Sequence, residues 1–181
     1  MTVTDRRITR RFVPLMVAVI AVVGIIDQAT KALMLHLLQD GNIIYVIGDW
    51  FRFRLLFNPG AAFSMGENAT WLFTCFQIAF LSGVLIYSPK VRDRFTALSL
   101  ALIGGGALGN LIDRLFRAPE FFIGHVVDFI SVGNFAVFNI ADAAITTGVA
   151  LFIVSMVVED LLQRRAQAKA DATAVTPGGE K

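Results

Sequence analysis

The sequence has little charge, very few histidines and a single cysteine. Asp, Glu, Lys and Arg make up 17% of its 181 residues, whereas hydrophobic residues make up 56%. The lone Cys75 excludes an intramolecular disulfide, and its apolar neighbours lack the positive charge that activates a thiolate, so we expect a small buried residue there. A net charge of +2 is too small to indicate nucleic acid as a partner. This composition is typical of an integral membrane protein.

Four apolar stretches are long enough to cross a membrane, which takes about 20 mostly apolar residues. They cover residues 12–35, 71–87, 95–115 and 138–158. Basic residues gather before the first stretch, between the second and third, and after the fourth. By the positive-inside rule, both termini are expected in the cytoplasm and the two larger loops outside it. The first stretch exceeds signal-peptide length, so we interpret it as a retained anchor helix.

The spans divide the chain into three parts. A basic segment, residues 1–11, precedes a four-helix transmembrane domain, residues 12–158, whose outer loops cover 36–70 and 116–137. Residues 159–181 form a polar tail whose small residues and Pro/Gly end predict disorder. In the first outer loop, WFRFRLLF alternates aromatic and basic residues with a period of two, which predicts a strand before the Asn58-Pro59-Gly60 turn. The resulting small sheet either anchors the chain at the membrane–water boundary or guides a membrane-embedded substrate.

Polar side chains interrupt the first and third apolar stretches. Asp27 and Lys31 lie four residues apart in the first, on one helix face, which favours a structural ion pair over direct chemistry. At the outer end of the third, Asp113 is expected to pair with the adjacent Arg114, with Asn110 on the same face.

Small residues also mark the third stretch. Gly105 and Gly109 are four residues apart, a pattern that lets membrane helices approach closely. The same glycines fit a loose nucleotide-binding pattern, but no strand precedes them and they lie within a span. We therefore dismiss nucleotide binding.

Asp128 and Asp142 stand out because no basic residue lies within a helical turn of either. Both fall near the outer boundary, Asp128 in the second outer loop and Asp142 at the start of the fourth stretch. Two acids close together in a low dielectric share a proton, so one can act as a base on water while the other acts as an acid. The alternative is two separately solvated acids near a helix N-terminus, where Asp is favoured.

Other arrangements of the same residues are weaker. His125, Asp128 and Ser131 can be drawn as a hydrolytic triad, but their local spacing does not establish the geometry. His125 with Asp128 and Asp142 can be drawn as a metal site, yet two histidines in the whole chain make zinc a poor fit, and no metal is expected.

Five blocks of the sequence resemble the bacterial lipoprotein signal peptidases, the signal peptidase II family. The resemblance covers residues 12–158 and leaves out the termini. The blocks occur in the family's order: DQATK at 27–31, FNPGAAFS at 57–64, GGALGNLIDR at 105–114, VVDF at 126–129 and FNIADAA at 138–144. Ala143 stands where the family often has serine, a small-for-small difference.

The resemblance implies an aspartyl endopeptidase of the bacterial inner membrane, expected to be a monomer and to need no cofactor. Its substrates would be prolipoproteins with a lipobox cysteine that carries diacylglyceryl, cut just before that cysteine and surrounded by membrane lipid. Asp128 and Asp142 would be catalytic. The supporting or substrate-binding residues would be Asp27, Lys31, Asn58, Gly60, Asn110, Asp113, Arg114 and Asn139.

The resemblance also implies a fold and leaves two rival functions. The fold is an all-α membrane protein with four transmembrane helices, a small extracytoplasmic β-cradle and a helical outer loop, to which residues 118–125 would belong. One rival is a proton-coupled transporter with Asp27, Asp113 and Asp142 as relay sites, but the acids cluster toward one side and the sequence shows no internal repeat. The other rival is a purely structural membrane partner, which leaves Asp128 and Asp142 unexplained.

Overall fold

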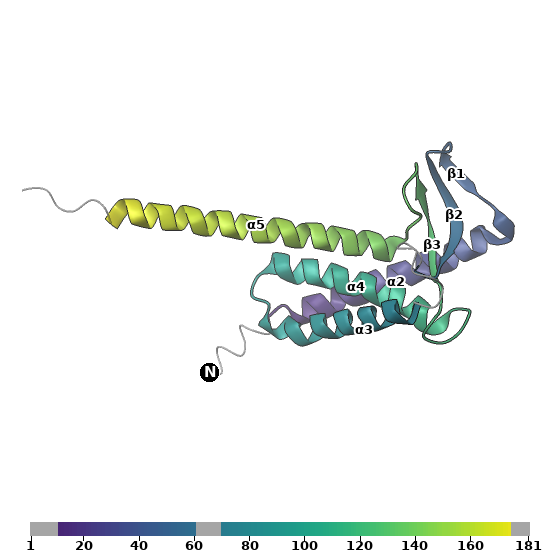
Figure 1. Ribbon diagram of the computed structural model, residues 1–181, viewed down its shortest axis with the longest axis horizontal. Helices are drawn as coiled ribbons and strands as arrows, with labels where there is room; N and C mark the ends of the chain where they lie inside the picture. The colour runs from purple at the N-terminus through teal and green to yellow at the C-terminus, as the bar shows by residue number, and fades with distance from the viewer. Residues whose placement is uncertain (1–10, 61–69, 175–181) are drawn as a thin grey trace, which may run out of the picture.

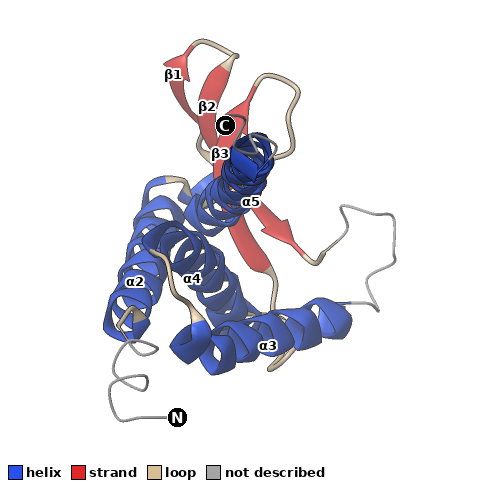
Figure 2. Cartoon of the chain, turned by 90° about the vertical axis from the view of Figure 1, so that its left-hand side faces the viewer, coloured by secondary structure: helices blue, strands red, loops and turns tan. Residues whose placement is uncertain are grey.

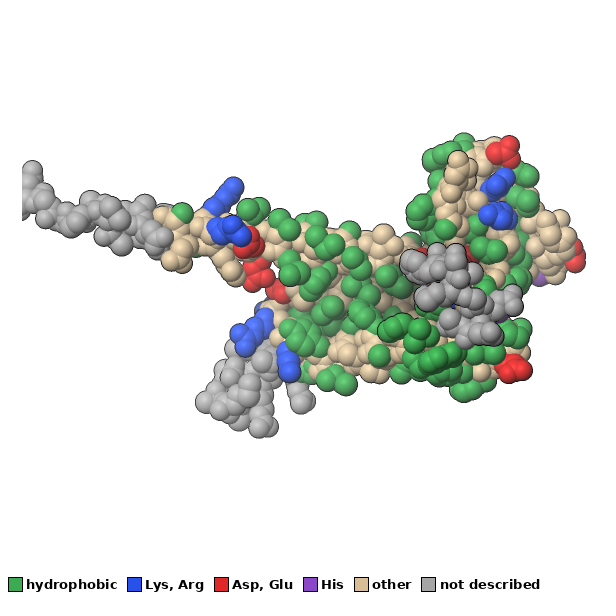
Figure 3. Space-filling view, viewed as in Figure 1, with side chains coloured by type: hydrophobic (Ala, Val, Ile, Leu, Met, Phe, Trp, Pro, Cys, Tyr) green, Lys and Arg blue, Asp and Glu red, His purple; other side chains and the backbone are tan. Residues whose placement is uncertain are grey.

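The computed structural model describes residues 11–60 and 70–174. Its four long helices are α2 (Val13–Leu37), α3 (Thr70–Tyr87), α4 (Arg94–Phe116) and α5 (Ile140–Ala174). All four are long and apolar enough to cross a membrane, which confirms the predicted spans. Hydrophobic side chains cover the visible face of the bundle, whereas charged side chains gather near its two ends (Figure 3).

Helix α4 is the centre of the bundle and contacts α2, α3 and α5. Viewed along the bundle, it lies between α3 and α5 (Figure 2). Its glycines allow this close contact. A Cβ on Gly105 would meet Val23 at 2.7 Å, and one on Gly109 would meet the Asp27 carboxylate. The predicted close approach of helices at these two glycines is confirmed.

A three-stranded antiparallel sheet stands at one end of the bundle (Figure 1). Its strands, in the order β1-β2-β3, are β1 (Ile44–Ile47), β2 (Phe51–Asn58) and β3 (Val126–Val132). The 3-10 turn η1 (Gln39–Gly41) leads into β1, and η4 (Ser88–Lys90) joins α3 to α4. β2 is the strand predicted from the alternating WFRFRLLF segment. Its pairing with β3 joins the two outer loops and places Leu56 opposite Asp128.

The fourth helix extends beyond its predicted end. α5 continues to Ala174, so the disorder predicted for residues 159–181 is wrong for 159–174. This segment is rich in Ala, Leu, Gln and Arg, which favour helix, and Arg164 pairs with Asp160 one turn earlier. Residues 175–181, like most of the basic N-terminal segment, lie outside the described residues.

Two local expectations differ from the structure. Residues 117–139 contain β3 and turns but no helix, so the expected helical outer loop is absent from this segment. Instead, the loop folds back on the end of α4, because Gly124 N donates to Arg114 O (2.9 Å) and His125 N to Ala118 O (2.8 Å). Cys75 is exposed on α3 rather than buried, because it lies on a face of that helix that does not pack against the rest of the bundle.

Candidate active site

Asp128 lies on β3 and is almost fully buried, with 1% of its surface exposed. Asn58 Nδ2 donates to one carboxylate oxygen (2.9 Å), and Asn139 Nδ2 donates to the other (2.6 Å). Burial raises the pKa of Asp128 from 3.8 to about 6, and the charge of Asp142 adds to this rise. The two amide donors and Lys31 oppose it. Asp128 is therefore a carboxyl that can hold a proton near neutral pH.

Asp142 lies in the first turn of α5, where it forms a capping box with Asn139. Asp142 N donates to Asn139 Oδ1 (2.9 Å), and Asn139 N donates to Asp142 Oδ2 (3.2 Å). This reciprocal pair satisfies backbone donors at the start of the helix. The preference of Asp for helix N-termini thus applies to Asp142, alongside any chemical role.

Two asparagines join the two acids into one hydrogen-bond network. Asn139 Nδ2 bonds Asp128 while its backbone and Oδ1 engage Asp142. Asn110 Nδ2 donates to Asp142 Oδ1 (2.8 Å), and Asn110 Oδ1 accepts from Asn139 Nδ2 (3.2 Å). The structure therefore brings a residue of β3 and a residue of the first turn of α5 to one site.

Beneath this network lies a buried ion cluster centred on Lys31. Lys31 Nζ lies 2.8 Å from Asp27 Oδ2 and 2.7 Å from Asp113 Oδ2, and all three side chains are fully buried. The same ammonium donates to Asn110 Oδ1 at 3.0 Å. The expected pair between Asp27 and Lys31 is present. Because buried charges are costly when unpaired, each carboxylate depends on this lysine.

Asp113 does not pair with Arg114, contrary to the expectation from their adjacency. Its partners are Lys31 and Arg117, and Arg117 lies four residues further along the chain, directly after the last residue of α4. The side chain of Arg114 instead donates to the backbone carbonyls of Asn58 and Gly124, each at 3.0 Å. Neighbours on a helix diverge by about 100°, so residues three or four apart share partners and adjacent ones do not. Arg114 thus ties the end of β2 and the second outer loop to α4.

The turn after β2 holds Asn58 in place. Gly60 N donates to Asn58 Oδ1 (2.8 Å), which leaves Asn58 Nδ2 free to face Asp128. Gly60 has φ +104°, a left-handed conformation that favours glycine, and a Cβ there would collide with the Phe73 ring. Residues 61–64 of the FNPGAAFS block lie outside the described residues.

The alternative constellations are not assembled. The Ser131 hydroxyl accepts from Arg54 Nε (3.4 Å), whereas the Asp128 carboxylate accepts from two asparagines, so His125, Asp128 and Ser131 form no triad. Within residues 11–60 and 70–174, no three His, Cys, Asp or Glu side chains gather as metal ligands. The drawn metal site is therefore not supported.

Two residues of the site were not singled out from the sequence. Gln28 Nε2 donates to Asp113 Oδ1 (3.0 Å) and to Gly109 O (2.9 Å). Arg117 Nε donates to the same Asp113 oxygen at 2.5 Å. The spacing of four between Asp113 and Arg117 is the signal that predicts this pair. Gln28 lies inside the DQATK block, between two residues that were selected.

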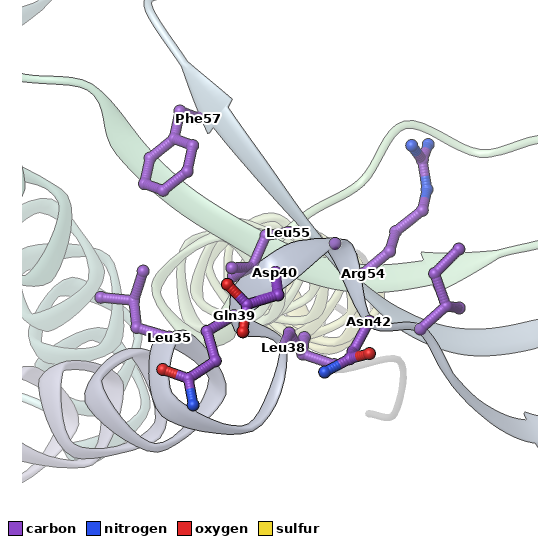
Figure 4. Close-up of a pocket in the computed structure, with 10 residues that line it drawn as sticks. Leu35, Leu38, Gln39, Asp40, Asn42, Arg54, Leu55 and Phe57 are labelled. Carbon is purple, nitrogen blue, oxygen red and sulfur yellow. The ribbon is translucent and has the colours of Figure 1, made fainter.

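A separate cavity of about 540 Å³ lies where α2 and η1 meet β2. Apolar side chains, including Leu35, Leu38 and Phe57, line it together with polar side chains such as Asp40 and Arg54 (Figure 4). Neither of the two acids lines this cavity. The residues that line it come from the end of α2, from η1 and the segment after it, and from β2, so this cavity is separate from the site that contains the two acids.

The fold matches a solved bacterial membrane enzyme. The two superpose with a TM-score of 0.69 at 27% sequence identity, over 93% of this chain and 95% of the other. The four spans, the small sheet and the buried polar site therefore define a membrane-spanning enzyme.

The comparison with protein families narrows this class. The protein-family model described as "Signal peptidase (SPase) II" matches residues 19–158 of this chain. The lipoprotein signal peptidase of Rhodococcus jostii is 45% identical over 140 residues, covering 77% of this chain and 71% of that protein. That of Streptomyces coelicolor is 41% identical over 150 residues, covering 83% and 74%. The chain belongs to the signal peptidase II family.

Proposed function

We propose that this peptidase is an aspartic endopeptidase that removes signal peptides from prolipoproteins, with Asp128 and Asp142 as its catalytic pair. Family membership supports the peptidase activity and the lipoprotein substrates. The observation that carries the catalytic assignment is the shared network in which Asn139 bonds both acids. The substrate bears a lipobox whose cysteine carries diacylglyceryl, and the cut falls just before that cysteine.

The pair divides the chemistry between an acid and a base. Asp128 has a pKa raised to about 6 and holds the shared proton, so it polarises the scissile carbonyl. Asp142, held at the N-terminus of α5, removes a proton from the attacking water. The tetrahedral intermediate collapses when the leaving amine takes a proton, and no acyl-enzyme forms. Asn110 and Asn139 hold the acids, and Arg114 holds the strand that carries Asn58.

The transporter alternative is not favoured by the same contacts. Two of its relay candidates, Asp27 and Asp113, share the ammonium of Lys31 in a fully buried cluster. A proton relay needs carboxyls that exchange protons with solvent. Asp27 and Asp113 are better suited to a structural role.

The enzyme lies in the bacterial inner membrane as a monomer. Both termini face the cytoplasm, and the sheet with the acid pair lies at the extracytoplasmic face. The supporting observation is the distribution of basic residues. The connection between α3 and α4 contains Lys90, Arg92 and Arg94, and it lies at the end of the bundle away from the sheet (Figure 1). The part of α5 that carries Arg164 and Arg165 lies on the same side.

Cleavage by purified protein tests the assignment. The protein in detergent is incubated with a diacylglyceryl-modified prolipoprotein, and the size shift is followed on a gel. Asp128→Asn and Asp142→Asn should each reduce cleavage to background, because each loses a carboxyl that the reaction needs. Asp160→Asn, which removes an exposed acid far along α5, is the matched control and should cleave like wild type. Substantial cleavage by either catalytic variant contradicts the pair.

A further inference from the structure

The ion cluster around Lys31 contacts the backbone immediately before each proposed catalytic acid. Asp27 Oδ1 accepts from Ala141 N (2.9 Å), the residue that precedes the acid on α5. Asp113 Oδ2 accepts from Val127 N (3.1 Å), the residue that precedes the acid on β3. Two supporting carboxylates thus hold the two segments that present the pair. Their own orientation therefore sets the geometry of the site.

Lys31 alone does not neutralise the negative charge of this cluster. It supplies one positive charge to two fully buried carboxylates, Asp27 and Asp113. Arg117 supplies the second, through its Nε bond to Asp113 Oδ1. Gln28 reinforces the contact, because its Nε2 donates to the same Asp113 oxygen and its Oε1 accepts from Arg117 Nη2 (3.3 Å). Without Arg117, a buried carboxylate lacks a full counter-charge.

We infer that Arg117 is a positioning residue for the proposed catalytic Asp128. Arg117 and Gln28 occupy one oxygen of Asp113 and leave the other to bind Lys31 and the Val127 amide. This contact fixes the start of β3, so Asp128 points toward Asn139. The inference rests on the proposed role of Asp128.

The charges of the whole site agree with this role. Its carboxylates are Asp27, Asp113, Asp128 and Asp142, and its cations are Lys31, Arg114 and Arg117. With one proton shared by the catalytic pair, three negative charges face three positive ones. Loss of Arg117 leaves one negative charge of the site without a counter-charge and weakens the hold on Asp113 Oδ1, which then keeps only the contact from Gln28. Both effects act on the reaction rather than on substrate binding.

Arg117→Gln and Arg117→Lys test the inference by kinetics on the full-length protein with the lipidated prolipoprotein. We expect Arg117→Gln to lower kcat by about 10- to 100-fold with KM within about twofold, because a misplaced catalytic group slows the reaction without weakening binding. Arg117→Lys, which keeps the charge, should recover most of kcat. Arg164→Gln is the control, because Arg164 makes the same kind of contact with Asp160, four residues away on exposed helix.

The folded fraction is measured by gel filtration and thermal unfolding, and kcat is expressed per folded molecule. Wild-type kcat in Arg117→Gln overturns the inference. A raised KM with unchanged kcat also overturns it, because that result indicates contact with the substrate. So does an Arg117→Gln variant that yields no folded protein while Arg117→Lys is fully normal, because that result indicates a purely structural role. If the proposed catalytic role of Asp128 is itself wrong, a different result shows it: the Asp128→Asn variant cleaves the substrate.

Discussion

Asp128 owes its acid–base character to its neighbours. Its burial is the largest cause of its raised pKa, and the negative charge of Asp142 adds to the rise. Asn58, Asn139 and Lys31 oppose the rise. An aspartate with a pKa of about 6 suits the proposed role, in which the catalytic pair shares one proton.

Replacing Asp142 should lower the pKa of Asp128. Asp142→Asn removes a negative charge that favours the protonated form of Asp128, so that form should be lost at a pH below about 6. The measurement is the infrared carbonyl band of the protonated carboxyl, followed through a pH titration. Asp160→Asn should leave the titration unchanged. A pKa for Asp128 that stays the same or rises in Asp142→Asn contradicts the electrostatic link between the two acids.

Single-residue expectations from the sequence succeeded where partners are close along the chain. The pair between Asp27 and Lys31 follows from a spacing of four on one helix, and the structure contains it. The expected pair between Asp113 and Arg114 failed, because adjacent helical residues point in different directions. Arg117 was overlooked although the same rule of four predicts it.

Helices α4 and α5 pack closely where α4 has a glycine. Gly106 faces α5, where an added Cβ would collide with the backbone oxygen of Ala141 and with Ile145 Cγ1 at 2.7 Å. Ala141 also donates its amide to Asp27, so this contact lies directly beside the site. A backbone atom cannot move aside as a flexible side chain can. The close spacing between α4 and α5 at this point therefore depends on the absence of a side chain at Gly106.

Gly106→Ala should lower the thermal unfolding midpoint and the activity together. The added methyl forces α5 away from α4, an overpacking that typically costs about 1–3 kcal/mol. Gly83→Ala is the matched control, because Gly83 lies on α3 with nothing within 4 Å of an added Cβ. There the substitution should be neutral or stabilising by about 0.5–1 kcal/mol, since alanine favours helix. Equal unfolding midpoints for the two variants would contradict the close α4–α5 contact.

In the whole molecule, the proposed catalytic pair lies at one end of the helix bundle. The sheet closes that end, and β3 and the start of α5 carry the two acids there (Figure 1). α5 extends past the bundle at the opposite end. Sidedness in the membrane therefore decides which compartment the site faces.

Cysteine labelling in intact cells tests the sidedness. In a Cys75→Ser background, Tyr45→Cys on exposed β1 should react with a membrane-impermeant maleimide added outside. Glu159→Cys, exposed near the opposite end, should react only after the cells are broken, because the positive-inside rule predicts that this end lies in the cytoplasm. Labelling of Glu159→Cys in intact cells, without labelling of Tyr45→Cys, would show the reverse orientation.

The sequence by itself determined the spans and a strand in the WFRFRLLF segment, and it singled out Asp128 and Asp142, because hydropathy, a period of two and unpaired charges are local properties. Only the tertiary structure decided which groups hold those acids. Asp27 meets Ala141, 114 positions away, and Lys31 meets Asn110, 79 positions away. Such partners are set by how α2, α4 and α5 pack, and this packing cannot be predicted from the pattern of residues that are close together in the sequence. The same packing sets the burial that raises the pKa of Asp128.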